Sequence, residues 1–170
     1  MAIHEITIYT DGSYKKSTNS GGWGFCICTD TEPNKFWGWG GYGGPDTTNQ
    51  RMELMALVQG IIFFRLLQKE LHRSTEVVTL NLCTDSAYIY NCYKDKWYEK
   101  WETNGWLNSK GKPVANQDLW EIIIENFKSP EIVLMKVKGH DGVPGNEKAD
   151  ELANAGAEKK TLIKMDAQEL

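Results

Sequence analysis

Hydrophobic and polar residues alternate along the opening stretch of the chain, residues 6–13. This period-two pattern, rich in β-branched and aromatic residues, predicts a β-strand. Ile6 and Ile8 would point to one face of the strand, and Tyr9 and Asp11 to the other. We expect the strand to end at this aspartate, where it would hold a carboxylate at the edge of the core. Since an Asp-Gly pair is also common in simple turns, the carboxylate alone does not indicate a site.

The rest of the pattern predicts further strands joined by short turns or by helices. Strands are expected at residues 21–29, 35–42, 77–84 and 132–137, and helices at residues 51–71, 86–106, 116–127 and from 146 onward. Short connections make the first three strands an antiparallel meander, and a long helical link between later strands implies a right-handed parallel crossover. Thr47 and Gln50 match a capping box for the first helix, and Asn146 is a candidate cap for the last. A polar, glycine-rich loop at 138–145 contains His140.

Length and composition suit one globular domain. The chain has 170 residues, of which 41% are hydrophobic and 25% charged, which is enough for a sizeable core. No charged leader followed by an apolar run opens the sequence, and the longest apolar run, near residues 61–64, is too short to span a bilayer. Without a secretory signal, we expect a cytoplasmic protein with no membrane partner and with free thiols at Cys26, Cys28, Cys83 and Cys92.

The net charge of −4 argues against a nucleic-acid-binding protein, because such proteins usually carry a basic excess. It does not exclude one, since acids that bind divalent cations make the metal-free protein more negative than the working protein. Asp11 and Asp85 stand out at predicted strand ends, and Glu53 and Asp150 near predicted helix N-termini. Taken singly, each is ordinary, because acids near a helix N-terminus usually just complement the helix dipole.

The neighbours of these four acids form motifs that occur in a definite order. The motifs are Thr10-Asp11-Gly12-Ser13, Thr48-Asn49-Gln50-Arg51-Met52-Glu53-Leu54, Thr84-Asp85-Ser86, and Val137-Lys138-Gly139-His140 followed by Asn146, Asp150, Glu151, Leu152 and Ala153. Together with the tryptophan-rich segment that continues to Trp120, they resemble the ribonuclease H type 1 family in its bacterial ribonuclease HI-like form. Members of this family are endonucleases that cut the RNA strand of an RNA/DNA hybrid. The resemblance extends from about residue 3 to about residue 158.

The resemblance implies an α/β ribonuclease H-like fold, in which a mixed five-stranded sheet, with strands one to three antiparallel, is flanked by helices on both faces. It implies a single ribonuclease H domain at residues 1–160, followed by a tail at 161–170 that we expect to be loose. It also implies hydrolysis of the RNA strand of a hybrid, leaving 5′-phosphate and 3′-hydroxyl ends. The expected partner is the hybrid substrate, and we expect the protein to be a monomer.

The resemblance assigns roles to the acids. The metal-binding carboxylates of the family match Asp11, Glu53, Asp85 and Asp150. Asp11 would bridge two ions and Asp150 would complete one site, while Glu53 and Asp85 would complete the other. The expected cofactor is Mg²⁺, as two ions with substrate bound, because Mg²⁺ prefers carboxylate, water and phosphate oxygens; Mn²⁺ is expected to be able to substitute. Two such ions, about 4 Å apart, can activate the attacking water and stabilise the charge on the phosphate and on the leaving oxygen.

The remaining predicted site residues serve proton transfer and substrate binding. His140 matches a histidine that family members place in a mobile loop, where imidazole can transfer protons near neutral pH or assist product release. The plain alternative is an exposed loop histidine without a role. Substrate contacts are expected at Gly12, Ser13, Asn49, Gln50, Ser86, Trp101 and Asn116. Trp97, Trp101 and Trp106 are expected to form a small aromatic core, with Trp101 also touching the DNA strand.

Two rival functions stay open. One is a DNA-acting nuclease of the wider ribonuclease H-like superfold, as integrases and transposases are, because fold alone does not determine function. The other is a non-catalytic hybrid-binding module, although the presence of all four acids argues against it. The chain also departs from many bacterial relatives, which carry a basic cluster after the tryptophan that matches Trp101. Here those positions are Glu102, Thr103 and Asn104, which predicts a weaker grip on the hybrid.

Overall fold

The structure is a computed structural model that describes residues 3–71 and 77–160. The predicted C-terminal tail, residues 161–170, lies outside the described residues, and the limits of the single domain stay a prediction. Within the described ranges, no helix combines the length and the apolar character that crossing a bilayer requires.

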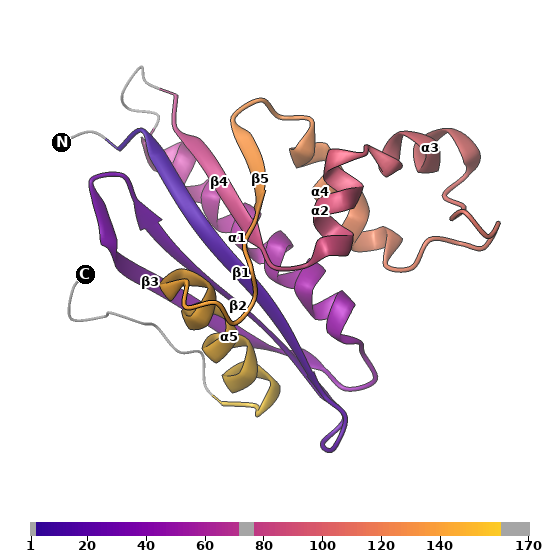
Figure 1. The fold of residues 1–170 in the computed structure, drawn as a ribbon, viewed down its shortest axis with the longest axis horizontal. Helices are drawn as coiled ribbons and strands as arrows, with labels where there is room; N and C mark the ends of the chain where they lie inside the picture. The colour runs from indigo at the N-terminus through magenta and orange to yellow at the C-terminus, as the bar shows by residue number, and fades with distance from the viewer. Residues whose placement is uncertain (1–2, 72–76, 161–170) are drawn as a thin grey trace.

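A mixed five-stranded sheet forms the centre of the fold (Figure 1), as predicted. Its strands are β1 (Glu5–Lys15), β2 (Ser20–Thr29), β3 (Glu32–Gly44), β4 (Thr79–Thr84) and β5 (Ile132–Lys136), in the spatial order β3-β2-β1-β4-β5. β1, β2 and β3 pair antiparallel, whereas β4 pairs parallel with both β1 and β5. The antiparallel meander and the parallel crossover expected from the connection lengths are therefore both confirmed.

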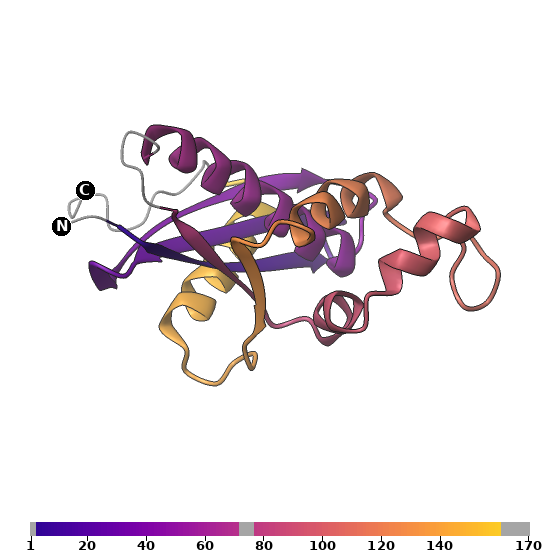
Figure 2. The ribbon, with the colours of Figure 1, turned by 90° about the horizontal axis from the view of Figure 1, so that it is seen from above.

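Helices cover both faces of this sheet, which confirms the predicted layers. The helices are α1 (Asn49–Leu71), α2 (Ala87–Lys94), α3 (Trp97–Asn104), α4 (Gln117–Phe127) and α5 (Pro144–Ala157). α1 packs against β1 and β2 on one face, and α5 packs against β1, β2 and β3 on the other (Figure 2). In the core below α1, the buried side chains of Ile8 and Leu82 reach Gly60 of that helix. α2, α3 and the loop that follows them extend beyond the sheet.

β1 is longer than predicted, so Asp11 lies inside a strand and not at its end. We expected the strand to stop at the Asp-Gly pair, but Asp11 pairs with Gly24, and the antiparallel ladder with β2 continues to Lys15. A partner strand that runs on alongside supplies the backbone hydrogen bonds that a turn would otherwise have to provide. What ends near Asp11 is the parallel pairing with β4, whose last pair is Tyr9 with Cys83.

A glycine on β2 lets α5 approach the sheet closely. A Cβ added at Gly24 would lie 2.6 Å from both the Ala149 carbonyl oxygen and the Ala153 backbone nitrogen of α5. Any larger residue at this position would therefore push the helix away from the sheet. Since Gly24 is the strand partner of Asp11, this contact brings the next residue of α5, Asp150, beside Asp11.

The starts of α1 and α5 differ from the prediction. The Oγ1 atom of Thr48, and not that of Thr47, accepts a hydrogen bond from the backbone N–H of Arg51 at 3.0 Å, so Thr48 caps α1. α5 begins at Pro144, which places Asn146 inside its first turn rather than at its cap. Proline suits the first helical position because it has no N–H to leave unpaired and its φ angle is already helical. The helix therefore starts two residues before the asparagine that was predicted to cap it.

The long helical segment predicted at residues 86–106 is two helices. α2 ends at Lys94 and α3 begins at Trp97. Between them Lys96 adopts a φ angle of 52°, in the left-handed region that interrupts a right-handed helix.

Candidate active site

Strand register brings two of the predicted acids together. Tyr9 of β1 pairs with Cys83 of β4, and Asp11 and Asp85 each lie two residues beyond that pair. Because the two strands are parallel, both carboxylates come to the same edge of the sheet, where β4 ends and β1 continues beside β2. Ligand sites in α/β folds commonly form at such carboxyl ends of parallel strands.

Glu53 joins these two acids from α1. A Cβ added at Gly12 would lie 2.2 Å from the backbone nitrogen of Glu53, so glycine is needed for β1 to pass this close to the helix. The Nδ2 atom of Asn49, one turn earlier on α1, donates to Glu53 Oε1 at 3.3 Å. Ser86, at the start of α2, hydrogen-bonds the same carboxylate. These contacts hold the Glu53 side chain against the ends of the strands.

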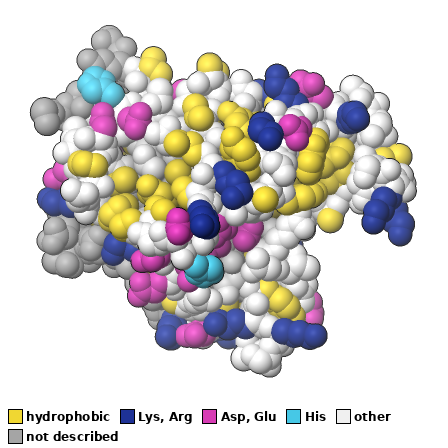
Figure 3. Space-filling view, in the orientation of Figure 1, with side chains coloured by type: hydrophobic (Ala, Val, Ile, Leu, Met, Phe, Trp, Pro, Cys, Tyr) yellow, Lys and Arg dark blue, Asp and Glu magenta, His cyan; other side chains and the backbone are white. Residues whose placement is uncertain are grey.

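The carboxylates form one cluster at this edge of the sheet. One ligand oxygen from each of Asp11, Glu53 and Asp85 lies within 4.8 Å of the others. Asp150 hydrogen-bonds the Asp11 carboxyl, and its charge acts on Asp85, so it borders the same cluster. Figure 3 shows acidic side chains gathered beside a hollow in this face of the molecule, with a histidine next to them. The structure thus brings the four acids singled out from the sequence to one place.

The crowding of negative charge raises the pKa values of these acids. Burial, followed by the charge of Asp85, raises the pKa of Asp11 to about 9. Burial and the charge of Asp85 raise the pKa of Glu53 to about 7. Burial also raises the pKa of Asp85, although a hydrogen bond from Asn146 and the charge of His140 oppose this rise. Without a cation, the cluster therefore retains protons at neutral pH.

These raised pKa values predict how the stability of the metal-free protein depends on pH. A carboxyl whose pKa is raised by folding stabilises the folded state below its unfolded-state pKa of about 4, and this contribution is lost as the pH rises through the folded-state value. For Asp11 and Glu53 the folded-state values are about 9 and about 7, so in EDTA we expect the melting temperature to fall between about pH 4 and about pH 9. At pH 8, Asp85→Asn should raise it by about 2–4 °C, on the order of 1 kcal/mol, because one repelling charge is removed.

Calorimetry in EDTA and in saturating Mg²⁺ measures this effect. Mg²⁺ is the control condition, because a cation neutralises the acids and the variant should then lose its advantage. A variant whose melting temperature in EDTA equals or falls below that of the parent would show that the four acids do not repel one another.

The ligand atoms of the cluster suit a hard divalent cation. Among the described residues, the group that can hold a metal offers carboxylate oxygens only, which Mg²⁺ and Mn²⁺ prefer over thiolate or imidazole ligands. The repulsion that helps to raise the pKa values of Asp11 and Glu53 is also the repulsion that a bound cation would relieve. The residues present therefore fit the type of metal that the sequence predicted.

His140 borders the cluster from the loop between β5 and α5. Its side chain is exposed, and its backbone has a φ angle of 55°. The loop passes directly beside the cluster, because a Cβ added at Gly139 would lie 3.2 Å from Asp85 Oδ2. The charge of His140 also acts on Asp85. This position is suited to a group that exchanges protons with a bound substrate.

Three of the predicted substrate contacts already have partners inside the protein. The Gly12 N–H donates to Asp11 Oδ1 at 2.9 Å, and the Ser13 hydroxyl donates to Asn154 Oδ1 at 2.8 Å. Ser86, which touches the cluster, is also the N-cap of α2. A substrate could therefore use the acceptor atoms of these residues but not the donors of Gly12 and Ser13.

Two further predicted contacts lie where α1 meets the start of α4. Asn116 has a φ angle of 62°, and its Oδ1 accepts a hydrogen bond from Arg51 Nη1 at 3.1 Å. Arg51 also forms a two-pronged ion pair with Asp118, at 2.8 and 3.0 Å. Gln50 hydrogen-bonds Tyr88 of α2. These contacts tie α1 to α2 and α4 and fix the position of Asn116.

The tryptophan-rich segment forms the predicted aromatic core. Trp101 is 6% exposed and packs against Trp106 and Trp120, with ring centroids 5.8 and 5.4 Å away. Its exposed edge lines a cavity of about 490 Å³ together with Tyr88 and Trp97. The contact of Trp101 with a DNA strand stays a prediction, limited to that edge.

Asn146 is a site neighbour that sequence reasoning missed. It is 4% exposed and hydrogen-bonds the Asp85 carboxylate. The available signal was its spacing, because a residue four positions before Asp150 on the same helix lies on the same face.

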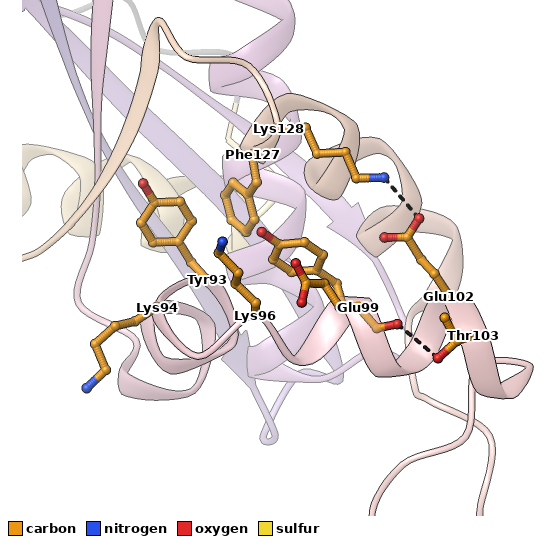
Figure 4. Close-up of a pocket in the computed structure, with 9 residues that line it drawn as sticks. Tyr93, Lys94, Lys96, Glu99, Glu102, Thr103, Phe127 and Lys128 are labelled. Atoms are coloured by element: carbon orange, nitrogen blue, oxygen red, sulfur yellow. Dashed lines mark hydrogen bonds and ion pairs between the residues drawn. The ribbon is translucent and has the colours of Figure 1, made fainter.

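A larger cavity, of about 820 Å³, lies away from the acid cluster (Figure 4). Its lining residues are Tyr93, Lys94, Lys96, Tyr98, Glu99, Glu102, Thr103, Phe127 and Lys128. In this cavity the Glu102 carboxylate pairs with Lys128 Nζ at 2.9 Å. None of the predicted site residues lines it, so its size does not indicate the chemistry of this protein.

Several known proteins are similar to this chain in sequence. The RNase H family model matches residues 4–158. Ribonuclease H of Moorella thermoacetica is 38% identical to this chain over 153 residues, which are 90% of this chain and 91% of that protein. Ribonuclease HI of Pseudomonas aeruginosa is 38% identical over 152 residues, 89% of this chain and 93% of that protein.

Solved structures share the fold. LC9-RNase H1, a type 1 RNase H with the type 2 active-site motif, has a TM-score of 0.71 at 23% identity, covering 99% of this chain and 81% of that chain. LC11-RNase H1, solved in complex with an RNA/DNA hybrid, has a TM-score of 0.64 at 21% identity, covering 91% of this chain and 97% of that chain. At these identities the structures establish the fold, and the sequence matches confirm the resemblance drawn from the motifs. The chain belongs to the ribonuclease H family.

Proposed function

We propose that this protein is an endonuclease that hydrolyses the RNA strand of RNA/DNA hybrids and leaves 5′-phosphate and 3′-hydroxyl ends. The observation that carries the proposal is the cluster of Asp11, Glu53 and Asp85, three carboxylates from separate elements within 4.8 Å of one another. Membership of the ribonuclease H family supports the reaction type. The hybrid bound to LC11-RNase H1 supports the choice of substrate.

The proposed cofactor is Mg²⁺, as two ions, with Mn²⁺ able to substitute. The residues that would hold the ions are Asp11, Glu53, Asp85 and Asp150. When bound, two such ions supply Lewis-acid stabilisation of charge on the phosphate and lower the pKa of the attacking water. The protein contributes the fixed orientation of the acids: Asp11 comes from the central strand, Glu53 is held by Asn49 and Ser86, and Asp150 is held by the close packing of α5.

His140 is proposed to transfer protons or to assist product release. Imidazole can both accept and donate a proton near neutral pH. The exposure of His140 lets it meet a substrate, and its loop passes beside Asp85. In this proposal His140 acts on the reacting phosphate, or on the departing product, from the solvent side of the cluster.

Substrate recognition is proposed to use both sides of the cluster. The RNA strand would contact Asn49, Gln50, Ser86 and the acceptor atoms of Gly12 and Ser13. Contact with the 2′-hydroxyl groups there would distinguish RNA from DNA. Asn116 and the cavity beside Trp101 are proposed to meet the DNA strand, because aromatic edges and amides suit stacking and phosphate contacts.

A cleavage assay on three duplexes separates this function from its rivals. The substrates are an RNA/DNA hybrid, double-stranded RNA and double-stranded DNA of one sequence, each with and without Mg²⁺. We expect cleavage of the hybrid alone. Cleavage of double-stranded DNA would favour the DNA-acting rival, and hybrid binding without cleavage would favour a binding module.

The acidic and neutral residues on α3 predict weak, salt-tolerant binding of the hybrid. Glu102 pairs with Lys128, and Asn104 closes the following loop through two hydrogen bonds with Leu107 at 3.0 Å. The double variant Glu102→Lys, Thr103→Lys leaves that loop intact and should add about one unit of salt slope for each new phosphate contact. KM should fall at moderate salt while kcat stays nearly constant, because these contacts are remote from the reacting phosphate.

Measuring KM and kcat at a series of salt concentrations tests this change in hybrid binding. Glu70→Lys, at the far end of α1, is the control for added positive charge. Equal KM values and equal salt slopes in the parent and the double variant would show that α3 does not touch the hybrid.

We further propose that the protein is a cytoplasmic monomer. The free, buried thiols of Cys28, Cys83 and Cys92 support a reducing compartment. Light scattering coupled to size-exclusion chromatography tests the oligomeric state, and a stable dimer would contradict this proposal.

A further inference from the structure

Asn146 combines a contact with Asp85 and an unpaired buried atom. The residue lies in the first turn of α5, is 4% exposed, and hydrogen-bonds the Asp85 carboxylate. Its Oδ1 atom is buried and has no hydrogen-bond partner within the part of the chain that the structure describes. Leaving a buried acceptor unpaired lowers stability, so some other interaction must hold the amide in this orientation.

The charge of Asp85 explains the orientation of the amide. A carboxylate only accepts hydrogen bonds, so it favours the NH₂ end of Asn146. Turning the amide over would bring Oδ1 against the carboxylate, and two acceptors would then repel each other. The side chain is therefore oriented by the metal-binding cluster and not by its own hydrogen-bonding needs.

The backbone on which Asn146 sits is fixed against the sheet. A Cβ added at Gly145 would lie 2.2 Å from the ring of Tyr9, and Cys26 Sγ donates to the Gly145 carbonyl oxygen at 3.1 Å. The first turn of α5 therefore rests directly on β1 and β2. Since Asn146 and Asp150 are four residues apart on one helix, the same face carries the contact to Asp85 and the contact to Asp11.

We propose that Asn146 is a positioning residue that holds the Asp85 carboxylate in its metal-binding orientation and ties it to the helix that carries Asp150. The inference rests on the proposed function for its reaction, but metal binding can be measured without any nucleic acid. Residues that hydrogen-bond a metal ligand fix its orientation, and their loss typically lowers metal affinity about 10–100-fold.

Calorimetric titration of the metal-free protein with Mn²⁺ tests the proposal. The variants are Asn146→Ala, which removes the amide, and Asn146→Ser, which replaces the amide by a shorter hydroxyl side chain. Leu152→Val is the control for loosened packing of the same helix, because Leu152 packs against Gly24 and Gly38 and offers no ligand or hydrogen-bonding atom. We expect Kd for Mn²⁺ to rise about tenfold or more in both Asn146 variants. In Leu152→Val it should stay within about twofold while the melting temperature falls.

The outcomes separate this inference from the proposed reaction. An unchanged Kd in a folded Asn146 variant, or an equal rise in Leu152→Val, would overturn the proposal, as would a parent protein without saturable Mn²⁺ binding. A parent that binds Mn²⁺, loses affinity in the Asn146 variants and cuts no hybrid would support the inference and refute the reaction. If the parent cleaves the hybrid, excess Mg²⁺ should restore most of kcat in Asn146→Ser and leave KM for the hybrid unchanged. A general loss of structure in this variant would not be rescued by Mg²⁺.

Discussion

Asp85→Asn is expected to lower the rate of Mg²⁺-dependent hybrid cleavage by about a thousandfold or more while leaving the fold intact. Asp85 supplies one of the three carboxylates that lie within 4.8 Å of one another. Asparagine has nearly the same size but no charge, so it weakens the hold on a divalent cation and the stabilisation of charge on the phosphate. The fold should tolerate the change, because the amide relieves repulsion from the neighbouring acids. Single-turnover cleavage of an end-labelled hybrid measures the rate.

Asp95→Asn is the matched control for this loss of charge. Asp95 is exposed at the C-terminal end of α2 and lies outside the cluster. Its replacement removes one negative charge from the neighbouring helix, so we expect a rate within about twofold of the parent. If a folded Asp85→Asn variant turned over at a near-normal rate, Asp85 would not be a metal ligand.

His140→Ala is expected to slow turnover about a hundredfold without abolishing it. A general acid or base typically contributes 10² to 10⁴-fold, while the metal ions at the carboxylates would supply the rest. The left-handed backbone of His140, with a φ angle of 55°, complicates this variant, because alanine is strained there. His140→Asn separates the two effects, since asparagine tolerates positive φ and does not titrate.

Comparison of kcat for the two His140 variants at saturating hybrid decides the role. A similar loss of rate in His140→Ala and His140→Asn would assign the effect to the imidazole. Complete loss of cleavage would instead place His140 among the groups that the metal site requires, and no loss would remove it from the mechanism.

The layers were predictable because local patterns and connection lengths leave few topologies, whereas the choice of the four acids rested on the resemblance of their motifs to the ribonuclease H family. Alternation in β1 identified the face that packs on α1, through Ile8. The short turns before and after β2 allowed only antiparallel pairing, and the helical link to β4 allowed only a parallel crossover. Parallel pairing of β1 with β4 then brings Asp11 and Asp85 to one edge, in the register that the structure shows.

Other features depend on partners distant in sequence and were not predictable. β1 runs past Asp11 because β2 continues beside it, and an Asp-Gly pair read alone favours a turn. Asn146 resembles a helix cap in sequence, but the burial of α5 turns its side chain toward Asp85. The break at Lys96 rests on a left-handed backbone, which has no reliable signal in a lysine.

Cleavage of a hybrid whose RNA and DNA strands carry different end labels tests the central claim most directly. The parent protein is incubated with this substrate in Mg²⁺ and in EDTA, and the ends of the products are identified by their susceptibility to phosphatase and ligase. We predict cuts in the RNA strand only, with 5′-phosphate and 3′-hydroxyl ends, and none in EDTA. Cleavage that persists in EDTA, or that falls on the DNA strand, would contradict the assignment of the acid cluster as a metal-dependent ribonuclease H site.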